Sequence, residues 1–167
     1  MNVLYFSLQS AALIGTSAAN PHRCAAKNAV YASPISGMSL SFIDIGRRRG
    51  IISDLAVRIL ERRTHHEFWY YFDQGSAPKI SLISTTGVTG PTWSPGPNGG
   101  KPPYGTATFI GLRKSGEILF DAPSSKSAAP DYVIIPELAG VFKTMRLWDV
   151  DANAFVLIGC SKSRAAG

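Results

Sequence analysis

The chain has 167 residues, of which 45% are apolar and 10% aromatic, so it can bury the core of one ordinary domain and is not an intrinsically disordered chain. Charged residues make up 17%, and Lys and Arg outnumber Asp and Glu by 17 to 11, which gives a net charge of +6. That surplus suits an anionic partner but says nothing about the fold. No apolar run is long enough for a transmembrane helix, which needs about 20 residues.

The N-terminus is predicted to be an apolar leader. Residues 1–21 carry no charged side chain, Val3–Ile14 is mostly apolar, and small residues follow up to Ala19. This pattern resembles a secretory signal peptide over residues 1–19 and predicts export to the periplasm or cell exterior. The missing basic residue before the apolar stretch, and Arg23 just after it, argue the other way. A buried N-terminal helix or strand and a natural start at Met38 stay open, and the protein would then be cytoplasmic.

The two cysteines, Cys24 and Cys160, lie near opposite ends of the chain. In an oxidising compartment they would be able to pair, tying the N-terminal arm to the last strand and stabilising the fold by about 3–5 kcal/mol. Their spacing matches no zinc or CxxC motif, so the alternative is two unconnected small core residues.

The chain is expected to form one domain over residues 39–160, preceded by an arm or linker at 20–38 and followed by a polar tail at 161–167. Leu40–Ile45 is the first expected strand. The strongest pattern is Asp54–Asp73, where apolar residues at strand period lead into five consecutive aromatic residues. This segment is predicted to be a hairpin that turns at His65-His66.

That turn sets a register. Ile59 would lie opposite Phe72 on the core side of the sheet, together with Leu55 and Val57. On the outer side, Arg62 would lie over Trp69 in a cation–π pair.

The rest of the chain predicts more hairpins and one helix. Pro136 suits the first turn of that helix, and apolar residues from Leu138 to Met145 fall on one face. Further strands are expected at Ile80–Ser84, Thr106–Arg113, Glu117–Phe120, Tyr132–Ile135, Leu147–Val150 and Phe155–Ile158. The predicted fold is therefore mainly β (α+β), an antiparallel sheet or small sandwich of hairpins with one packed helix near 136–146.

No catalytic or metal-binding motif stands out. His65 and His66 are neighbours on a strand, where successive side chains point to opposite faces, so the pair does not suit one metal ion. Residues 149–153 begin like a calcium loop, but Ala154 and Cys160 stand where such a loop needs Gly and Glu. No nucleophile, phosphate-loop or dinucleotide motif occurs. We expect no cofactor and no catalytic activity, and a small hydrolase with an unrecognised site stays as an alternative.

Two segments are candidates for binding. Arginines are dense between Arg47 and Arg63, and positive charge beside exposed aromatic side chains suits a nucleic acid or a polyanionic glycan. A solvated outer face, whose arginine stems cover apolar surface, is the alternative. The candidate residues of this segment are Arg47, Arg48, Arg49, Arg62, Trp69 and Tyr71. The second candidate is Trp93, which would anchor a partner to the long 84–105 loop or pack against the sheet.

These observations favour an exported binding or protein-interaction domain without catalytic activity, whose partner is an unknown protein or a polyanionic ligand. The main alternative is an intracellular nucleic-acid-binding protein that uses the Arg47–Arg63 basic cluster.

Overall fold

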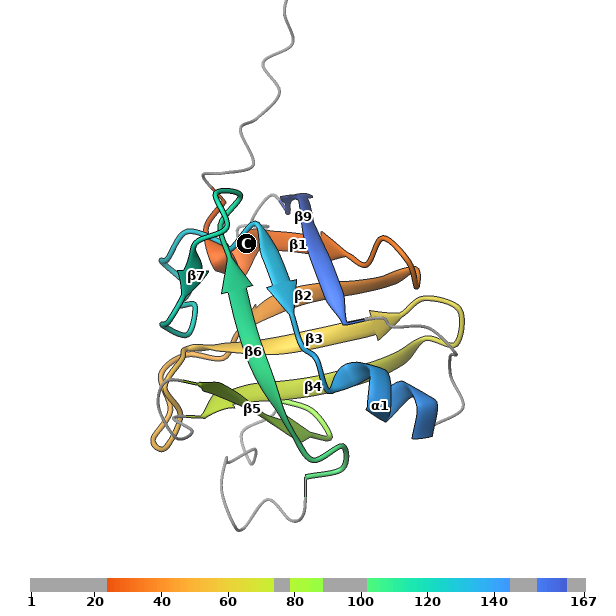
Figure 1. Ribbon diagram of the computed structural model, residues 1–167. Coiled ribbons are helices and arrows are strands. Elements are labelled where there is room, and N and C mark those ends of the chain that lie inside the picture. The colour runs from red at the N-terminus through yellow and green to blue at the C-terminus, as the bar shows by residue number, and fades with distance from the viewer. Residues whose placement is uncertain (1–23, 74–78, 89–101, 145–152, 162–167) are drawn as a thin grey trace, which may run out of the picture.

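A computed structural model describes residues 24–73, 79–88, 102–144 and 153–161, and the strands of this part form one antiparallel sheet. Neighbouring strands follow the order β5-β4-β3-β2-β1-β9-β8-β6, and β6 also pairs with β5, so eight strands close into a barrel (Figure 1). A ninth strand, β7, is added to β6. The strands are β1 (Ala29–Ala32), β2 (Met38–Asp44), β3 (Leu55–Glu61), β4 (His66–Asp73), β5 (Ile80–Thr85), β6 (Thr106–Leu112), β7 (Ile118–Leu119), β8 (Tyr132–Ile134) and β9 (Ala154–Cys160).

The predicted mainly β fold with one helix is confirmed, and the sheet closes into a barrel instead of splitting into a sandwich. The long strand β6 makes the closure. Its first half, up to Phe109, pairs with β5, while its other edge pairs with β8 from Ile110 onward. Closure leaves none of the eight barrel strands with an unpaired edge.

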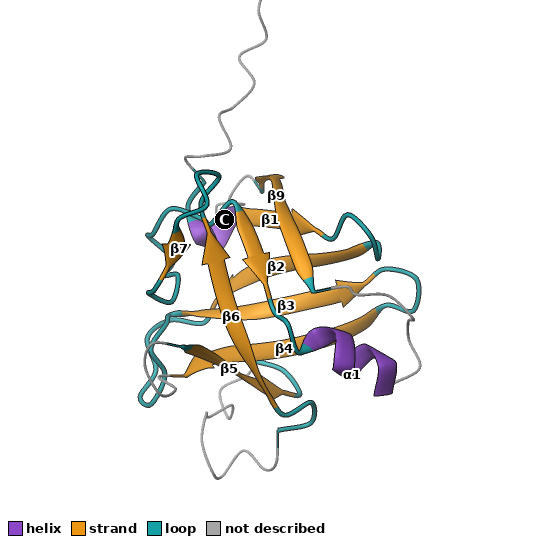
Figure 2. Ribbon diagram, in the orientation of Figure 1, coloured by secondary structure: helices purple, strands orange, loops and turns teal. Residues whose placement is uncertain are grey.

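Side chains fill the interior of the barrel. An eight-stranded barrel is just wide enough to be filled in this way, and the inward positions are large and aromatic. Phe109 packs against Phe42 at 6.2 Å and against Phe72 at 5.1 Å between ring centroids. Helix α1 (Leu138–Thr144), which confirms the predicted helix, covers one end of the barrel (Figure 2), and its Phe142 packs on Phe68 at 5.0 Å. Ligand-binding surfaces must therefore be sought at the rim or outside.

The β3–β4 hairpin keeps its predicted faces but not its predicted register. Ile59 pairs with Phe68 and Glu61 pairs with His66, so the turn lies at residues 62–65 and not at His65-His66. The shift moves each pairing by an even number of residues, so the inward positions, Ile59 included, stay inward.

The buried carboxylate of Glu61 explains the early turn. It accepts hydrogen bonds from the backbone N–H of Arg63 at 2.9 Å and of Thr64 at 2.6 Å, and from the Thr64 hydroxyl. His65 completes the turn with φ of 57°, in the left-handed region. In the shifted register Arg58, and not Arg62, lies over Trp69.

The segment at 20–38 was expected to be an arm or linker, but part of it forms strand β1. This strand pairs with β2 and β9 and belongs to the barrel wall. Four residues are too few to show a strand period among neighbouring turn residues. Strand β9 confirms the expected strand at 155–158, although it pairs with β1 and β8. The expected strand at 147–150, its hairpin turn and most of the calcium-like segment lie outside the described residues.

Candidate functional site

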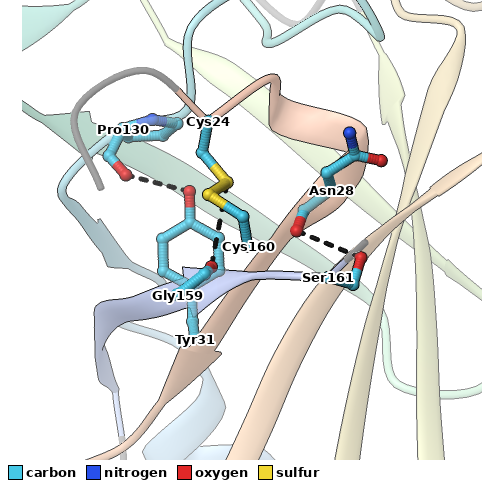
Figure 3. Close-up of a disulfide and its surroundings, with 7 residues drawn as sticks. All are labelled: Cys24, Asn28, Tyr31, Pro130, Gly159, Cys160 and Ser161. Carbon is cyan, nitrogen blue, oxygen red and sulfur yellow. Dashed lines mark hydrogen bonds between the residues drawn. A yellow bond between two sulfur atoms is a disulfide. The ribbon is translucent and has the colours of Figure 1, made fainter. Parts of the chain in front are cut away.

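Cys24 and Cys160 form a disulfide that joins the entrance of β1 to the end of β9, with Cα atoms 5.8 Å apart (Figure 3). Backbone hydrogen bonds surround it: the N–H of Ala129 donates to the carbonyl of Cys24 at 2.8 Å, and the N–H of Ser161 donates to the carbonyl of Asn28 at 2.7 Å. The 3₁₀ helix η2 (Ala26–Asn28) connects the disulfide to β1. The two ends of the described chain are thus fixed at one rim of the barrel.

Tyr31 lies beside the disulfide, and its hydroxyl donates to the carbonyl of Pro130 at 2.9 Å (Figure 3). Burial, together with the charge of Asp131, raises the pKa of this hydroxyl, so it stays a neutral donor. The bond ties β1 to the loop before β8.

The outer face of the first hairpin is occupied by its own side chains. Arg58 forms an ion pair with Glu67, and its guanidinium lies 5.7 Å from the ring centroid of Trp69. The indole N–H of Trp69 donates to the other carboxylate oxygen of Glu67 at 3.0 Å. Tyr71, which was expected to be exposed here, is only 7% exposed and cannot act as a stacking platform.

The structure does not bring the arginines of the Arg47–Arg63 segment together. Arg47, Arg48 and Arg49 lie in the connection before β3, whereas Arg62 lies in the turn after it. The seven residues of β3 keep the two groups about 20 Å apart. Arg58 lies between them within β3, so the arginines of the predicted Arg47–Arg63 basic cluster are spread along one strand.

Arg47 and Arg48 instead meet Lys126, from the loop between β7 and β8, around a hollow of about 540 Å³, which we name the cationic hollow. Arg47 and Lys126 are exposed, and Arg48 is half-buried with its Nε donating to the carbonyl of Ile45 at 3.2 Å. The other residues that line the hollow are Ile51, Ile52, Ser53, Asp54 and Ser124.

Two contacts clamp the loops that form the cationic hollow. The carboxylate of Asp54 accepts from the backbone N–H of Ser125 at 2.8 Å and from its hydroxyl at 2.6 Å. The hydroxyl of Ser53 donates to the carbonyl of Pro123. These contacts hold Lys126 next to the arginines although it lies far from them in sequence.

Asp54 is an anion at neutral pH. Its partial burial alone would raise its pKa, but the hydrogen bonds from Ser125 and the nearby Arg47 outweigh this and lower the pKa. Both of its carboxylate oxygens already accept hydrogen bonds from Ser125. Three cationic side chains and one carboxylate thus line the hollow, an arrangement that suits a bound anion with several acceptor oxygens.

The remaining candidate residues do not join this site. His65 is exposed at the hairpin turn, and the Nε2 of His66 lies 3.1 Å from the hydroxyl of Tyr104. Trp93 lies outside the described residues. Sequence reasoning missed Lys126, whose only signal was a basic residue in a loop of small residues.

Comparison with protein-family models, with curated proteins and with solved structures finds no match to this chain. In the part of the chain that the structure describes, no helix is both long and apolar enough to cross a membrane, and no three His, Cys, Asp or Glu residues are grouped to hold a metal ion.

Proposed function

We propose that this protein is a small, non-enzymatic binding protein of the periplasm or cell exterior, and that it recognises an anionic group of a polyanionic ligand in the cationic hollow. The observation that carries the proposal is the convergence of Arg47, Arg48 and Lys126, from two separate loops, on one hollow. Guanidinium groups bind carboxylate, sulfate and phosphate oxygens through paired hydrogen bonds, and the ammonium adds a point charge.

Export is supported by two features. The apolar leader at residues 1–19 has the pattern of a secretory signal, and the Cys24–Cys160 disulfide is of the kind that persists in oxidising compartments. Removal of residues 1–19 would leave both cysteines in place. A chain that began at Met38 would lack both Cys24 and strand β1.

The outer face of the first hairpin supports the nucleic-acid alternative less well. Arg58 lies over one face of the Trp69 ring, the indole N–H of Trp69 is bonded to Glu67, and Tyr71 is buried, so the two rings do not form an open stacking surface for bases. The intracellular hypothesis stays a prediction, which an oligonucleotide in the same assay would test.

Titration calorimetry with a sulfated polysaccharide, such as heparin, tests the proposal. We expect Arg47→Ala, Arg48→Ala and Lys126→Ala each to weaken binding by about tenfold, as expected for the loss of a charge-assisted contact. Arg62→Ala is the matched control, because it removes the same charge from an exposed arginine at the other end of β3.

The Arg62→Ala control distinguishes binding in the cationic hollow from attraction by the net charge of the protein. If Arg62→Ala weakens heparin binding as much as Arg47→Ala does, net charge alone attracts the polymer. The cationic hollow would then not be its binding site. Tighter binding of a single-stranded oligonucleotide than of heparin, again weakened by Arg47→Ala, would favour the nucleic-acid hypothesis instead.

A further inference from the structure

The connection between β2 and β3 forms a loop that projects from one end of the barrel (Figure 1). The backbone N–H of Ile45 donates to the carbonyl of Asp54 at 2.9 Å, and this bond closes the base of the loop. Gly46 and Gly50 have φ of 66° and 84°, in the left-handed region, so the chain bends sharply at these two positions. Residues 46–52 therefore form a distinct tip beyond the strands, which we name the basic tip.

The basic tip combines cations with aliphatic side chains. It contains three consecutive arginines and two consecutive isoleucines, and it has no acidic residue. Arg47 and Arg49 are exposed, and Ile52 is 43% exposed. The tip therefore presents positive charge and an aliphatic side chain to solvent within a few residues of one another.

The acidic residues nearest to the basic tip along the chain lie at its base. The carboxylate of Asp44 accepts a hydrogen bond from the backbone N–H of Gly46 at 3.0 Å. The carboxylate of Asp54 accepts from the backbone N–H of Ser125 at 2.8 Å. Both carboxylates are thus held at the loop base by backbone donors, and the arginines of the tip lie beyond them.

Aliphatic side chains also belong to the cationic hollow itself. Ile51 and Ile52 line it together with Arg47, Arg48 and Lys126. A sulfated sugar chain uses only the cations of such a site. An anionic lipid in a bilayer uses both kinds of side chain, because its charged headgroup lies next to the apolar acyl region. The lining of the hollow therefore favours a lipid surface as the carrier of the bound anionic group.

We infer that the basic tip docks on an anionic membrane surface. The headgroup of an anionic lipid would lie in the cationic hollow, and Ile52 would enter the boundary between the headgroups and the acyl chains. The inference rests on the proposed function, because it names the carrier of the anionic group that the hollow binds. The protein would lie on the membrane and would not span it.

The contacts predict weak and reversible binding. The cations are Arg47, Arg48, Arg49 and Lys126. Each cation near an anionic surface strengthens binding about fivefold, and covering the exposed part of Ile52 adds a factor of about five. The product is an association constant of roughly 3,000 M⁻¹, below the about 10⁴ M⁻¹ of a single myristoyl chain. Half of the protein should therefore bind at about 0.3 mM accessible lipid, and added salt should weaken the binding by screening the charges.

Cosedimentation of the disulfide-bonded protein with lipid vesicles tests the inference. Vesicles of phosphatidylglycerol and phosphatidylcholine should bind the protein, and vesicles of phosphatidylcholine alone should not. Ile52→Ser should weaken binding to the mixed vesicles about fivefold and leave heparin binding unchanged, because it removes an aliphatic side chain and no charge. Ile35→Ser is the matched control, because Ile35 is 64% exposed but lies in the turn between β1 and β2, at the other end of β2.

Three results would overturn the inference. The first is heparin binding that Arg47→Ala weakens, without binding to the mixed vesicles, which would leave the proposed function standing. The second is vesicle binding that Ile52→Ser does not weaken, or that Ile35→Ser weakens as much, which would mean that the isoleucine of the tip takes no part. The third is a protein that binds neither heparin nor vesicles, and this result would remove the proposed function as well.

Discussion

Removal of the Cys24–Cys160 disulfide is expected to lower the free energy of unfolding by several kcal/mol without changing the fold. The two cysteines are 136 residues apart, so the bond closes a loop that contains nearly the whole barrel. In the chain-entropy relation a loop of this length restricts the unfolded chain by about 5 kcal/mol. That is an upper value, because residual structure in the unfolded chain reduces the entropy that the bond removes. It still equals a large part of the about 5–15 kcal/mol that stabilises an ordinary domain.

Urea unfolding of the wild type and of a Cys24→Ser/Cys160→Ser variant, followed by circular dichroism, measures the effect. With a urea slope of about 2 kcal/mol per molar, the midpoint should fall by roughly 2 M. Reductant should move the wild type to the midpoint of the variant and leave the variant unchanged. Intact mass with and without reductant gives the state of the two thiols in the same samples.

A variant whose free energy of unfolding lies within about 1 kcal/mol of that of the oxidised wild type would contradict this expectation. In that case the backbone hydrogen bonds around Cys24 and Asn28 would already hold the two ends of the chain together. A native protein whose mass is unchanged by reductant would remove the support that the disulfide gives to export.

Three further changes test the core and the first hairpin. The hydroxyl of Tyr70 is buried with no hydrogen-bond partner in the described part of the chain. Tyr70→Phe should therefore raise the thermal midpoint of unfolding by about 2–4 °C in calorimetry. A lower midpoint would mean that the hydroxyl does have a hydrogen-bond partner. Burial alone would raise the pKa of Glu61, but the hydrogen bonds from Thr64 and its neighbour outweigh it and lower the pKa. The stability that this carboxylate contributes is therefore present above the unfolded pKa of about 4.3 and is lost as the pH falls through the lower, folded pKa. Glu61→Gln should therefore make the free energy of unfolding, measured by urea unfolding at neutral and acid pH, depend less on pH. An unchanged pH dependence would contradict this role of Glu61. Phe142→Ala should lower the free energy of unfolding by about 3–5 kcal/mol, because it removes the ring that packs on Phe68 and leaves a cavity under α1. A decrease below about 1 kcal/mol would mean that α1 does not close the barrel.

The faces of the first hairpin could be predicted from the sequence because side chains alternate with a period of two. An error of an even number of residues leaves that alternation intact, so the inward side of β3 and β4 was predicted correctly while their pairing was not. The register depends on Glu61, which turns the chain by accepting hydrogen bonds from residues directly after it. An acidic residue at a predicted core position did not by itself indicate a turn.

Long-range contacts account for what the sequence did not reveal. Strand β1 is too short to show a period, and it belongs to the barrel only because β2 and β9 flank it. Arg47 and Arg48 could be found from the sequence, whereas Lys126 joins them through the contact of Asp54 with Ser125. Arg62 was predicted to lie with them because it is close to them along the chain. The sequence did not show that the extended strand β3 separates them in space.

The position of the disulfide also determines how the protein would bear a mechanical load. Tension applied to the two ends of the chain would pass through one covalent bond between Cys24 and Cys160, which are 136 positions apart, and leave the segment between them unloaded. Once the bond is reduced, the same tension would act on Ala29 and Cys160, which are paired at the end of an antiparallel ladder. The ladder bonds lie perpendicular to the strands and would break one after another. Reduction would thus change a barrel that resists pulling into one that unzips from the β1–β9 seam.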